Sequence, residues 1–261
     1  MNISAREIRA VFFDMGGTLE DLQYDRQMRL EACRDLRVEL AARDLELGLT
    51  AEELFGVIEA GMSAYKDWAL DGMVEATPED IWSEWLLPEP HAPRAKVREL
   101  GEFLTFFWEN RFYARRLRPG AVETIRTLKS QGLAVGVISN TQSRTQVLVN
   151  LEKYRLADVV YPVLLSCLFG RRKPHPSIFL EAAKLAGVDP ADVVYVGDTY
   201  SRDILGAYQA GYRGSIFIRS QLSDRFDPDR FPPEIARNFA IVESLGEIPA
   251  LLDGFARESG A

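Results

Sequence analysis

The chain has 261 residues, of which 47% are hydrophobic and 27% are charged, a composition typical of globular proteins. Its formal net charge of −8 argues against a general nucleic-acid-binding role, because such proteins carry a basic surface. No apolar stretch approaches the roughly 20 residues that a membrane-spanning helix needs, and the first residues lack the apolar core of a signal peptide. With only Cys33 and Cys167, neither a disulfide framework nor a zinc site is expected. We therefore expect a soluble cytoplasmic protein.

The first apolar run, residues 10–13, ends abruptly at Asp14 and is followed by Met15-Gly16-Gly17-Thr18. A run bounded in this way by turn residues predicts a strand buried on both faces of a parallel sheet. Asp14 would then lie at the carboxyl end of the strand, where open α/β sheets bind their ligands. The two glycines allow a sharp turn and bring amide groups close to a bound group. On this stretch alone, an interpretation of Asp14 as a turn or cap residue is equally open.

Residues 22–113 show a helical pattern of apolar residues among charges. Thr50 and Glu53 form the sequence signature of a capping box and predict the start of a second helix. Thr77-Pro78 predicts the start of a third helix, with proline at the first helical position, and a fourth is expected over residues 94–113. All four tryptophans fall in this region, where aromatic residues at helical spacing favour a core.

Beyond Pro119-Gly120, which we interpret as a hinge, strands and helices alternate. Apolar runs predict strands at residues 133–138, 159–165, 193–196, 215–218 and 239–242. Helices are expected at residues 121–131, 176–186 and 204–210, and a further helix follows Thr141 and ends near Lys153. This alternation predicts an α/β fold with a doubly wound parallel sheet. We therefore expect a core domain made of residues 1–21 and 114–261. A helical cap domain, residues 22–113, would be inserted after the first strand.

Polar residues follow three of the predicted strands: Asp14, then Ser139-Asn140, then Asp198 with Asp203. Parallel topology brings these strand ends to one edge of the sheet, and Lys173 precedes a predicted helix. Adjacent carboxylates repel one another unless a cation joins them, and oxygen ligands of this kind suit Mg²⁺ together with a substrate phosphate. Lys173, Ser139 and Asn140 would then hold the phosphate oxygens. Asp14 would be left to attack the phosphorus.

Each of these residues also has a purely structural interpretation. Ser139 would cap the following helix, Asp203 would lie in a first helical turn, and Lys173 would be solvated. Together these interpretations require four coincidences at one sheet edge. The sequence therefore favours a site for phosphoryl transfer.

The four motifs, in this order, resemble those of the haloacid dehalogenase-like hydrolase superfamily. That family carries a strand followed by Asp-x-Asp-Gly-Thr, a strand ending in Ser or Thr, a lysine often in Lys-Pro-x-Pro, and Gly-Asp followed by a second Asp. The corresponding segments here are Asp14-Met15-Gly16-Gly17-Thr18, Ser139-Asn140, Lys173-Pro174-His175-Pro176, and Gly197-Asp198 with Asp203. The helical block of residues 22–113 matches the cap domain of the family.

The resemblance implies a role for each residue. Asp14 would be the nucleophile and a metal ligand, and the backbone carbonyl of Gly16, Asp198 and Asp203 would complete a Mg²⁺ site. Ser139 and Lys173 would bind the transferring phosphoryl group, while Thr18 would orient the loop for substrate binding. The implied activity is hydrolysis of a small phosphorylated molecule through an aspartyl-phosphate intermediate. His175 has no assigned role in the family, and we expect it to be structural.

Gly16 departs from the family pattern, because the phosphatases carry at this position a second aspartate that protonates the leaving group. A general acid or base typically contributes about 10²–10⁴ in rate. Either Glu20, Asp21 or a cap residue replaces it, or the substrates have good leaving groups. One alternative is a dehalogenase-like or phosphonatase-like enzyme; in the phosphonatase-like case, Lys66 or Lys96 would form a Schiff base with the substrate. Another is a non-catalytic relative that binds phosphate or a partner. Substrate identity and oligomeric state do not follow from the sequence.

Overall fold

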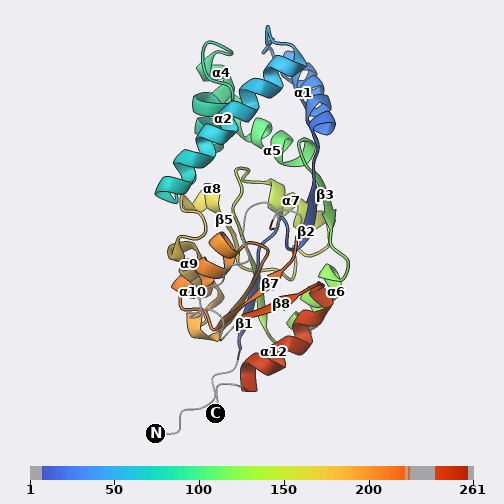
Figure 1. Cartoon of the computed structure of the whole chain (residues 1–261), viewed down its shortest axis with the longest axis vertical. Coiled ribbons are helices and arrows are strands. Elements are labelled where there is room, and N and C mark those ends of the chain that lie inside the picture. The colour runs from blue at the N-terminus through green and yellow to red at the C-terminus, as the bar shows by residue number, and fades with distance from the viewer. Residues whose placement is uncertain (1–7, 221–222, 224–238, 258–261) are drawn as a thin grey trace.

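The computed structural model describes residues 8–220, 223 and 239–257, and its centre is a parallel sheet of six strands (Figure 1). The strand order is β5-β4-β1-β6-β7-β8. The strands are β1 (Ala10–Phe13), β4 (Ala134–Ser139), β5 (Val163–Leu165), β6 (Val193–Gly197), β7 (Gly214–Ile218) and β8 (Phe239–Val242). The predicted parallel α/β sheet is confirmed. One strand is shorter than expected, because the run predicted at residues 159–165 forms a regular strand only over Val163–Leu165.

Strand β1 lies in the middle of the sheet, and all four of its residues are fully buried. It pairs with β4 and β6 in register, so that Phe13 is opposite both Val137 and Val196. The residues that follow these three strands therefore meet at the same edge of the sheet. This register places the candidate site.

Helices cover both faces of the sheet. Phe13 packs in a hydrophobic cluster with residues of α6 (Ala121–Ser130), α7 (Gln146–Lys153) and α12 (Ile248–Arg257). Phe12 points to the opposite face and packs with α9 (Pro176–Ala186) and α10 (Leu205–Gln209). Shorter helical segments are α8 (Ser166–Phe169), η2 (Pro190–Asp192), η3 (Tyr200–Ile204) and η5 (Leu245–Glu247). The sheet is therefore doubly wound, as predicted.

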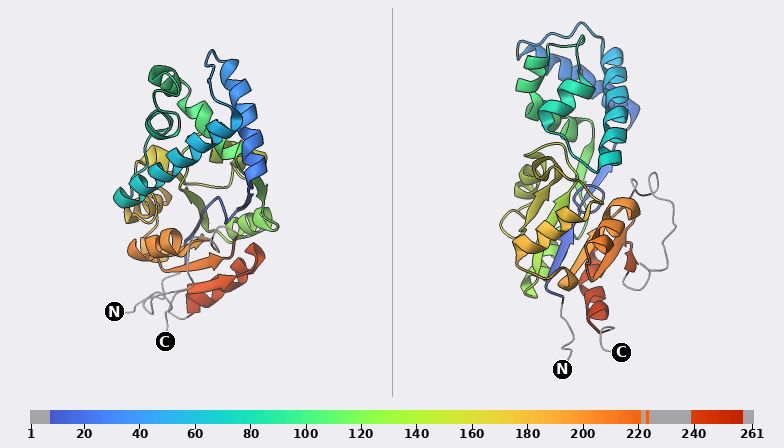
Figure 2. Two further views of the ribbon diagram at one scale, coloured as in Figure 1. Left: turned by 45° about the horizontal axis from the view of Figure 1, so that its top comes forward. Right: turned by 90° about the vertical axis from the view of Figure 1, so that its left-hand side faces the viewer.

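Residues 26–111 build a separate helical layer beyond the sheet (Figures 1 and 2). Its helices are α1 (Arg26–Ala41), α2 (Ala51–Gly72), α3 (Pro78–Asp80), η1 (Ile81–Leu86), α4 (Arg94–Glu99) and α5 (Gly101–Arg111). A hydrophobic cluster that extends from Leu30 to Phe112 holds these helices together. The layer is joined to the sheet by an antiparallel two-stranded ribbon, β2 (Glu20–Gln23) and β3 (Ala114–Leu117), which the sequence did not predict.

The helix starts in this layer follow the expected chemistry, but one predicted helix is interrupted. Thr50 and Glu53 form the capping box of α2, and the Thr77 side chain caps α3. The helix expected over residues 94–113 is two helices, α4 and α5, which meet near Gly101. A Cβ atom at Gly101 would lie only 2.6 Å from the Glu79 Cα, so glycine allows α5 to approach α3 closely. No helix in the described ranges is long and apolar enough to span a membrane.

Candidate active site

Lys173 is at the centre of the polar cluster that follows the strands. Its side chain is 1% exposed, and its ammonium group lies 2.8 Å from Asp14 Oδ1 and 2.6 Å from Asp203 Oδ1. It also donates a hydrogen bond to the Tyr195 hydroxyl at 2.9 Å. A buried ammonium is stable only when it is paired in this way. The interpretation of Lys173 as a solvated lysine is therefore wrong.

Asp203 lies in the first turn of η3, and both of its carboxylate oxygens have partners. Oδ1 accepts from Lys173, while Oδ2 accepts from the backbone N–H of Thr199 at 3.0 Å and from the Thr199 hydroxyl. Burial opposes ionisation, but Lys173 and Arg202 hold the pKa of Asp203 below its usual value. Asp203 is thus suited to hold Lys173 in place as a carboxylate.

Asp198 is fully buried and has an unsatisfied oxygen. Its Oδ2 accepts a hydrogen bond from the Ser220 hydroxyl, whereas Oδ1 has no hydrogen-bond partner within the described part of the chain. Burial, followed by the charges of Asp203 and Asp14, raises the pKa of Asp198 to about 7. A buried carboxylate oxygen without a donor, beside two further carboxylates, fits a site for a cation.

Asp14, Asp198 and Asp203 together offer oxygen atoms that all lie within 4.8 Å of one another. Three clustered carboxylates match the hard oxygen ligands that Mg²⁺ prefers. Gly17 makes this cluster possible, because a Cβ atom there would lie 2.0 Å from Asp198 Oδ2 and the backbone has a φ of +93°. Burial raises the pKa of Asp14, and the nearby Lys173 opposes this effect. The donor set therefore fits a divalent cation.

Ser139 and Asn140 lie at the end of β4, as predicted, but they have different surroundings. Ser139 is buried and lines the central cavity. It is not the cap of the following helix, since α7 has Thr145 at its N-cap position. The Asn140 side chain donates to the Lys173 carbonyl at 3.0 Å and accepts from the Lys173 backbone N–H at 2.8 Å. Its amide therefore holds the lysine loop, a role that we did not predict.

Thr18 and His175 have structural surroundings. Thr18 is fully buried, and it is not among the described residues that line the cavity. Its burial supports a role in shaping the loop rather than in contacting a bound group. His175 caps α9 by accepting from the Ser177 backbone N–H, in agreement with the structural role expected of it.

A cavity of about 300 Å³ lies between the sheet edge and the helical layer. Asp14, Gly16, Ser139 and Lys173 line it from the side of the sheet. The helical layer contributes Arg29, Lys66, Glu75, Trp108 and Glu109. Of these five, the sequence identified only Lys66 as a candidate site residue, because no motif distinguishes the others from core or surface residues.

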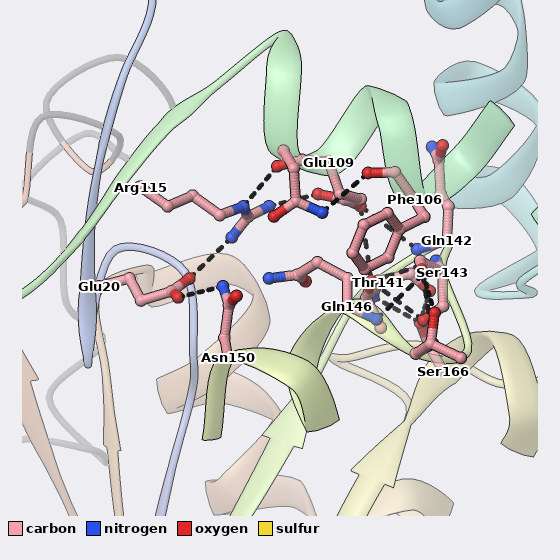
Figure 3. Close-up of polar contacts among 12 residues, drawn as sticks. Glu20, Phe106, Glu109, Arg115, Thr141, Gln142, Ser143, Gln146, Asn150 and Ser166 are labelled. Carbon is pink, nitrogen blue, oxygen red and sulfur yellow. Dashed lines mark hydrogen bonds and ion pairs between the residues drawn. The ribbon is translucent and has the colours of Figure 1, made fainter. Parts of the chain in front are cut away.

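Arg115 in β3 links the ribbon to the helical layer (Figure 3). It donates to Glu20 Oε2 at 2.9 Å and to the Glu109 carboxylate. The other oxygen of Glu20 accepts from Asn150 at 2.6 Å and from Tyr154 at 2.8 Å. Glu20 thus has both oxygens occupied, in a fully buried position. Its function in this structure is to join three elements.

Glu109 extends this network across the cavity to the loop after β4 (Figure 3). Its Oε1 accepts long contacts of 3.5 Å from the Thr141 hydroxyl and the Gln142 backbone N–H. Glu109 comes from α5, whereas Thr141 and Gln142 follow the strand that carries Ser139. The helical layer therefore contacts the loop beside the predicted phosphoryl site.

The parallel sheet, the buried aspartate–lysine centre and the helical layer above it define a class of hydrolase that has a doubly wound α/β core and an aspartate–lysine site. The chain belongs to the haloacid dehalogenase-like hydrolases: the family model with the description "haloacid dehalogenase-like hydrolase" matches residues 8–211. The protein is therefore a hydrolase.

Similar proteins include both phosphatases and a dehalogenase. The chain is 28% identical over 247 residues to a glyceraldehyde 3-phosphate phosphatase of Methanopyrus kandleri, covering 92% of this chain and 98% of that protein. It is 24% identical to an N-acylneuraminate-9-phosphatase of Mus musculus, covering 94% of both chains. The solved structure of a 2-haloacid dehalogenase from Pseudomonas syringae has a TM-score of 0.65 and 25% identity, covering 95% of this chain and 99% of the other.

Proposed function

We propose that the protein is a Mg²⁺-dependent phosphatase that hydrolyses a small phosphorylated molecule, with Asp14 as the nucleophile. The observation that carries this proposal is the contact of Asp14 with Lys173 beside the unsatisfied Asp198 carboxylate. The phosphatase names of the similar proteins support it. Retention of Asp198 favours a metal-dependent reaction, since its buried Oδ1 has no hydrogen-bond partner in the described part of the chain.

The contacts of Asp14 leave one oxygen for attack. Oδ1 accepts from Lys173 and, at 2.7 Å, from the Met15 backbone N–H, so Oδ2 would attack the phosphorus. The bond between Oδ2 and phosphorus forms while the bond from phosphorus to the leaving-group oxygen breaks, and that oxygen takes the electron pair. Water then attacks the phosphorus and the bond between phosphorus and Oδ2 breaks, which releases inorganic phosphate and restores the Asp14 carboxylate. The proton that the water loses balances the one that the leaving alkoxide takes up.

Lys173 and Ser139 would offset charge on the phosphoryl oxygens throughout these steps. Asn140 and Asp203 would position Lys173 through the contacts described above. Mg²⁺, held by Asp14, Asp198 and the Gly16 carbonyl, would neutralise and orient the phosphoryl group when bound. Asp203 would not bind the metal directly, because both of its oxygens already accept hydrogen bonds from Lys173 and Thr199. It would instead help to fix the positions of the neighbouring ligands.

The group that protonates the leaving oxygen is not supplied at Gly16. Glu20 is an unsuitable substitute, because Arg115, Asn150 and Tyr154 occupy its oxygens. Asp21 pairs with Arg118 at 2.8 Å and lines a different cavity. The carboxylates that do line the central cavity are Glu75 and Glu109, both from the helical layer. Glu75 accepts hydrogen bonds from the Tyr65 and Ser166 hydroxyls, whereas Glu109 Oε1 has only contacts of 3.5 Å, so Glu109 is the better candidate for the acid.

We further propose that residues 22–113 form a cap domain over a core of residues 1–21 and 114–261. The separate hydrophobic cluster of the helical layer supports this division. The β2–β3 ribbon adjoins the proposed hinge at Pro119-Gly120 and would bend with it. A cap that closes over the substrate would exclude water from the site.

A second candidate function is cleavage of a carbon–phosphorus bond through a Schiff base on Lys66. This lysine is exposed and lines the cavity, and partial desolvation there, together with the charges of Arg29, Arg172 and Arg202, lowers its pKa. A lowered pKa makes a lysine amine more nucleophilic at neutral pH. Lys96, the other lysine considered, pairs with Glu99 at 2.9 Å and is not among the described cavity residues.

Leaving-group dependence tests the main proposal. Without an acid at Gly16, kcat/KM for a series of aryl and alkyl phosphates should fall steeply as the pKa of the leaving alcohol rises. A flat series would contradict a site that lacks its acid. The Lys66→Arg variant tests the second candidate function. Because arginine cannot form the Schiff base, this candidate predicts that the variant no longer releases phosphate from phosphonoacetaldehyde.

A further inference from the structure

The lining of the central cavity is rich in cations. Among the described residues that line the cavity are six lysines and arginines but only three carboxylates, although the whole chain carries a net charge of −8. Two of these cations are neutralised inside the protein. Lys173 lies between Asp14 and Asp203, and Arg115 binds two glutamates.

Three of the remaining cations, Arg29, Lys66 and Arg172, have few acidic partners. Arg29 is 3.8 Å from Glu59 and otherwise faces the aromatic ring of Tyr24 at 4.0 Å. Arg172 is 3.6 Å from Glu75. Lys66 has neither an ion pair nor a hydrogen bond with any residue in the described ranges. We call Arg29, Lys66 and Arg172 the basic wall.

Unsatisfied hydrogen-bond donors accompany this excess of positive charge. The Nε atoms of Arg29 and Arg172 are buried, and neither has a hydrogen-bond partner in the described part of the protein. The same is true of the Gln146 Nε2 atom, which also lines the cavity. Buried donors in folded proteins are almost always satisfied. Two of the three belong to the basic wall, whose donors are therefore not all engaged by residues in the described ranges.

The cations of the basic wall also lie close enough to repel one another. Arg29 and Arg172, with Arg202, lower the pKa of Lys66 in addition to the effect of partial desolvation. Arg202 lines the same cavity, and its charge opposes the rise in the pKa of Asp14 and Asp198. A bound anionic group would relieve this repulsion. That group could belong to the same substrate molecule whose phosphoryl group contacts Asp14.

We infer that the basic wall binds a second anionic group of the substrate, so that the preferred substrate is a small phosphomonoester with a carboxylate or a second phosphate at its far end. This inference rests on the proposed phosphatase function. The cavity of about 300 Å³ is at the small end of ligand sites, which favours a compact metabolite over a nucleotide.

Matched substrates test the inference. 3-Phosphoglycerate is compared with glycerol 3-phosphate, and propane-1,3-diol bisphosphate with propyl phosphate, since each pair differs by the distal anion. The wild-type enzyme should prefer the anionic member of at least one pair, and the preferred pair identifies the anion as carboxylate or phosphate. In Lys66→Met this preference, measured as the ratio of kcat/KM values, should fall by about ten-fold or more, as expected for a lost charged hydrogen bond.

Two control variants make the result specific. Lys66→Arg keeps the charge and should retain most of the preference, which a Schiff-base role would not allow. Lys96→Met removes a cap lysine outside the cavity and should leave the ratio unchanged. A wild-type ratio near one in both pairs, or an unchanged ratio in Lys66→Met, would overturn the inference.

A binding measurement separates this inference from the proposed function. Calorimetry with Mg²⁺ compares 3-phosphonopropionate, propane-1,3-bisphosphonate and propylphosphonate, none of which requires turnover. Tighter binding of the first or second ligand that Lys66→Met weakens supports the basic wall even if no phosphomonoester is hydrolysed. Equal binding of all three ligands overturns the inference, even if the enzyme hydrolyses phosphomonoesters.

Discussion

The side-chain amide of Asn140 and the backbone of Lys173 form two reciprocal hydrogen bonds, of 3.0 and 2.8 Å. They fasten the loop that carries the buried lysine to the end of β4. Lys173 in turn contacts Asp14, so an error in the position of this loop is transmitted to the nucleophile. Asn140 thus acts on the site through another residue.

We predict that Asn140→Ala lowers kcat by about 10²-fold, because a displacement of about 1 Å at reacting groups has an effect of this size. KM should change much less, and steady-state kinetics with a phosphate ester would separate the two values. Asn110→Ala is the matched control, since among the described residues the Asn110 side chain bonds only to Phe106 of the same helix. An equal loss in both variants would indicate general destabilisation instead.

The two adjacent glycines should differ sharply in their tolerance of alanine. Gly17→Ala would place a methyl group 2.0 Å from Asp198 Oδ2 in a backbone with a φ of +93°, so the metal site should be destroyed. In Gly16→Ala the nearest atom is the flexible end of Leu22 at 3.0 Å, and the fold should adapt. Thermal unfolding with and without Mg²⁺ checks this. An intact Mg²⁺ response in Gly17→Ala would contradict the geometry.

Removal of the metal should be visible as a change in stability. At a hundredfold excess over its Kd, a ligand stabilises the folded state by about 2.7 kcal/mol, and each kcal/mol moves the Tm of a chain of this size by about 2–4 °C. Mg²⁺ should therefore raise the Tm of the wild type, and EDTA should reverse the effect. Asp198→Asn should abolish the response without lowering the metal-free Tm, because it removes one of three adjacent carboxylates. A Mg²⁺ response of wild-type size in Asp198→Asn would exclude Asp198 as a ligand.

Glu20 should matter for stability rather than for chemistry. Glu20→Gln leaves Arg115 with an incomplete set of partners in a buried network, and breaking such a pair costs about 3–5 kcal/mol. Urea unfolding would measure this loss, with Glu243→Gln as the exposed control. If Glu20 were the missing general acid, Glu20→Gln would instead steepen the leaving-group dependence and leave the urea midpoint unchanged.

The sequence predicted the sheet and its polar edge because both depend on local patterns. The apolar runs before Asp14, Ser139 and Asp198 are short and end at polar residues, and parallel pairing then brings these ends together. The pattern could not predict β2 and β3, since Glu-Asp-Leu-Gln and Ala-Arg-Arg-Leu lack the alternation of a half-buried strand.

The other features that the sequence did not predict depend on contacts between residues far apart in the chain. The close packing of α5 on α3 depends on the approach of Gly101 to Glu79, which are 22 positions apart. Arg29, Glu109 and Arg172 face one cavity only because the helical layer docks over the sheet edge. Nothing in their local sequence distinguishes them from solvated charges.

The most direct test of the proposed chemistry is release of phosphate from 4-nitrophenyl phosphate, with Mg²⁺ and with EDTA, by the wild type, Asp14→Asn and Gly16→Asp. We expect metal-dependent turnover by the wild type, loss of turnover in Asp14→Asn, and faster turnover in Gly16→Asp, which restores the acid of the family motif. Turnover that survives in EDTA or in Asp14→Asn would contradict an aspartyl-phosphate mechanism at this site.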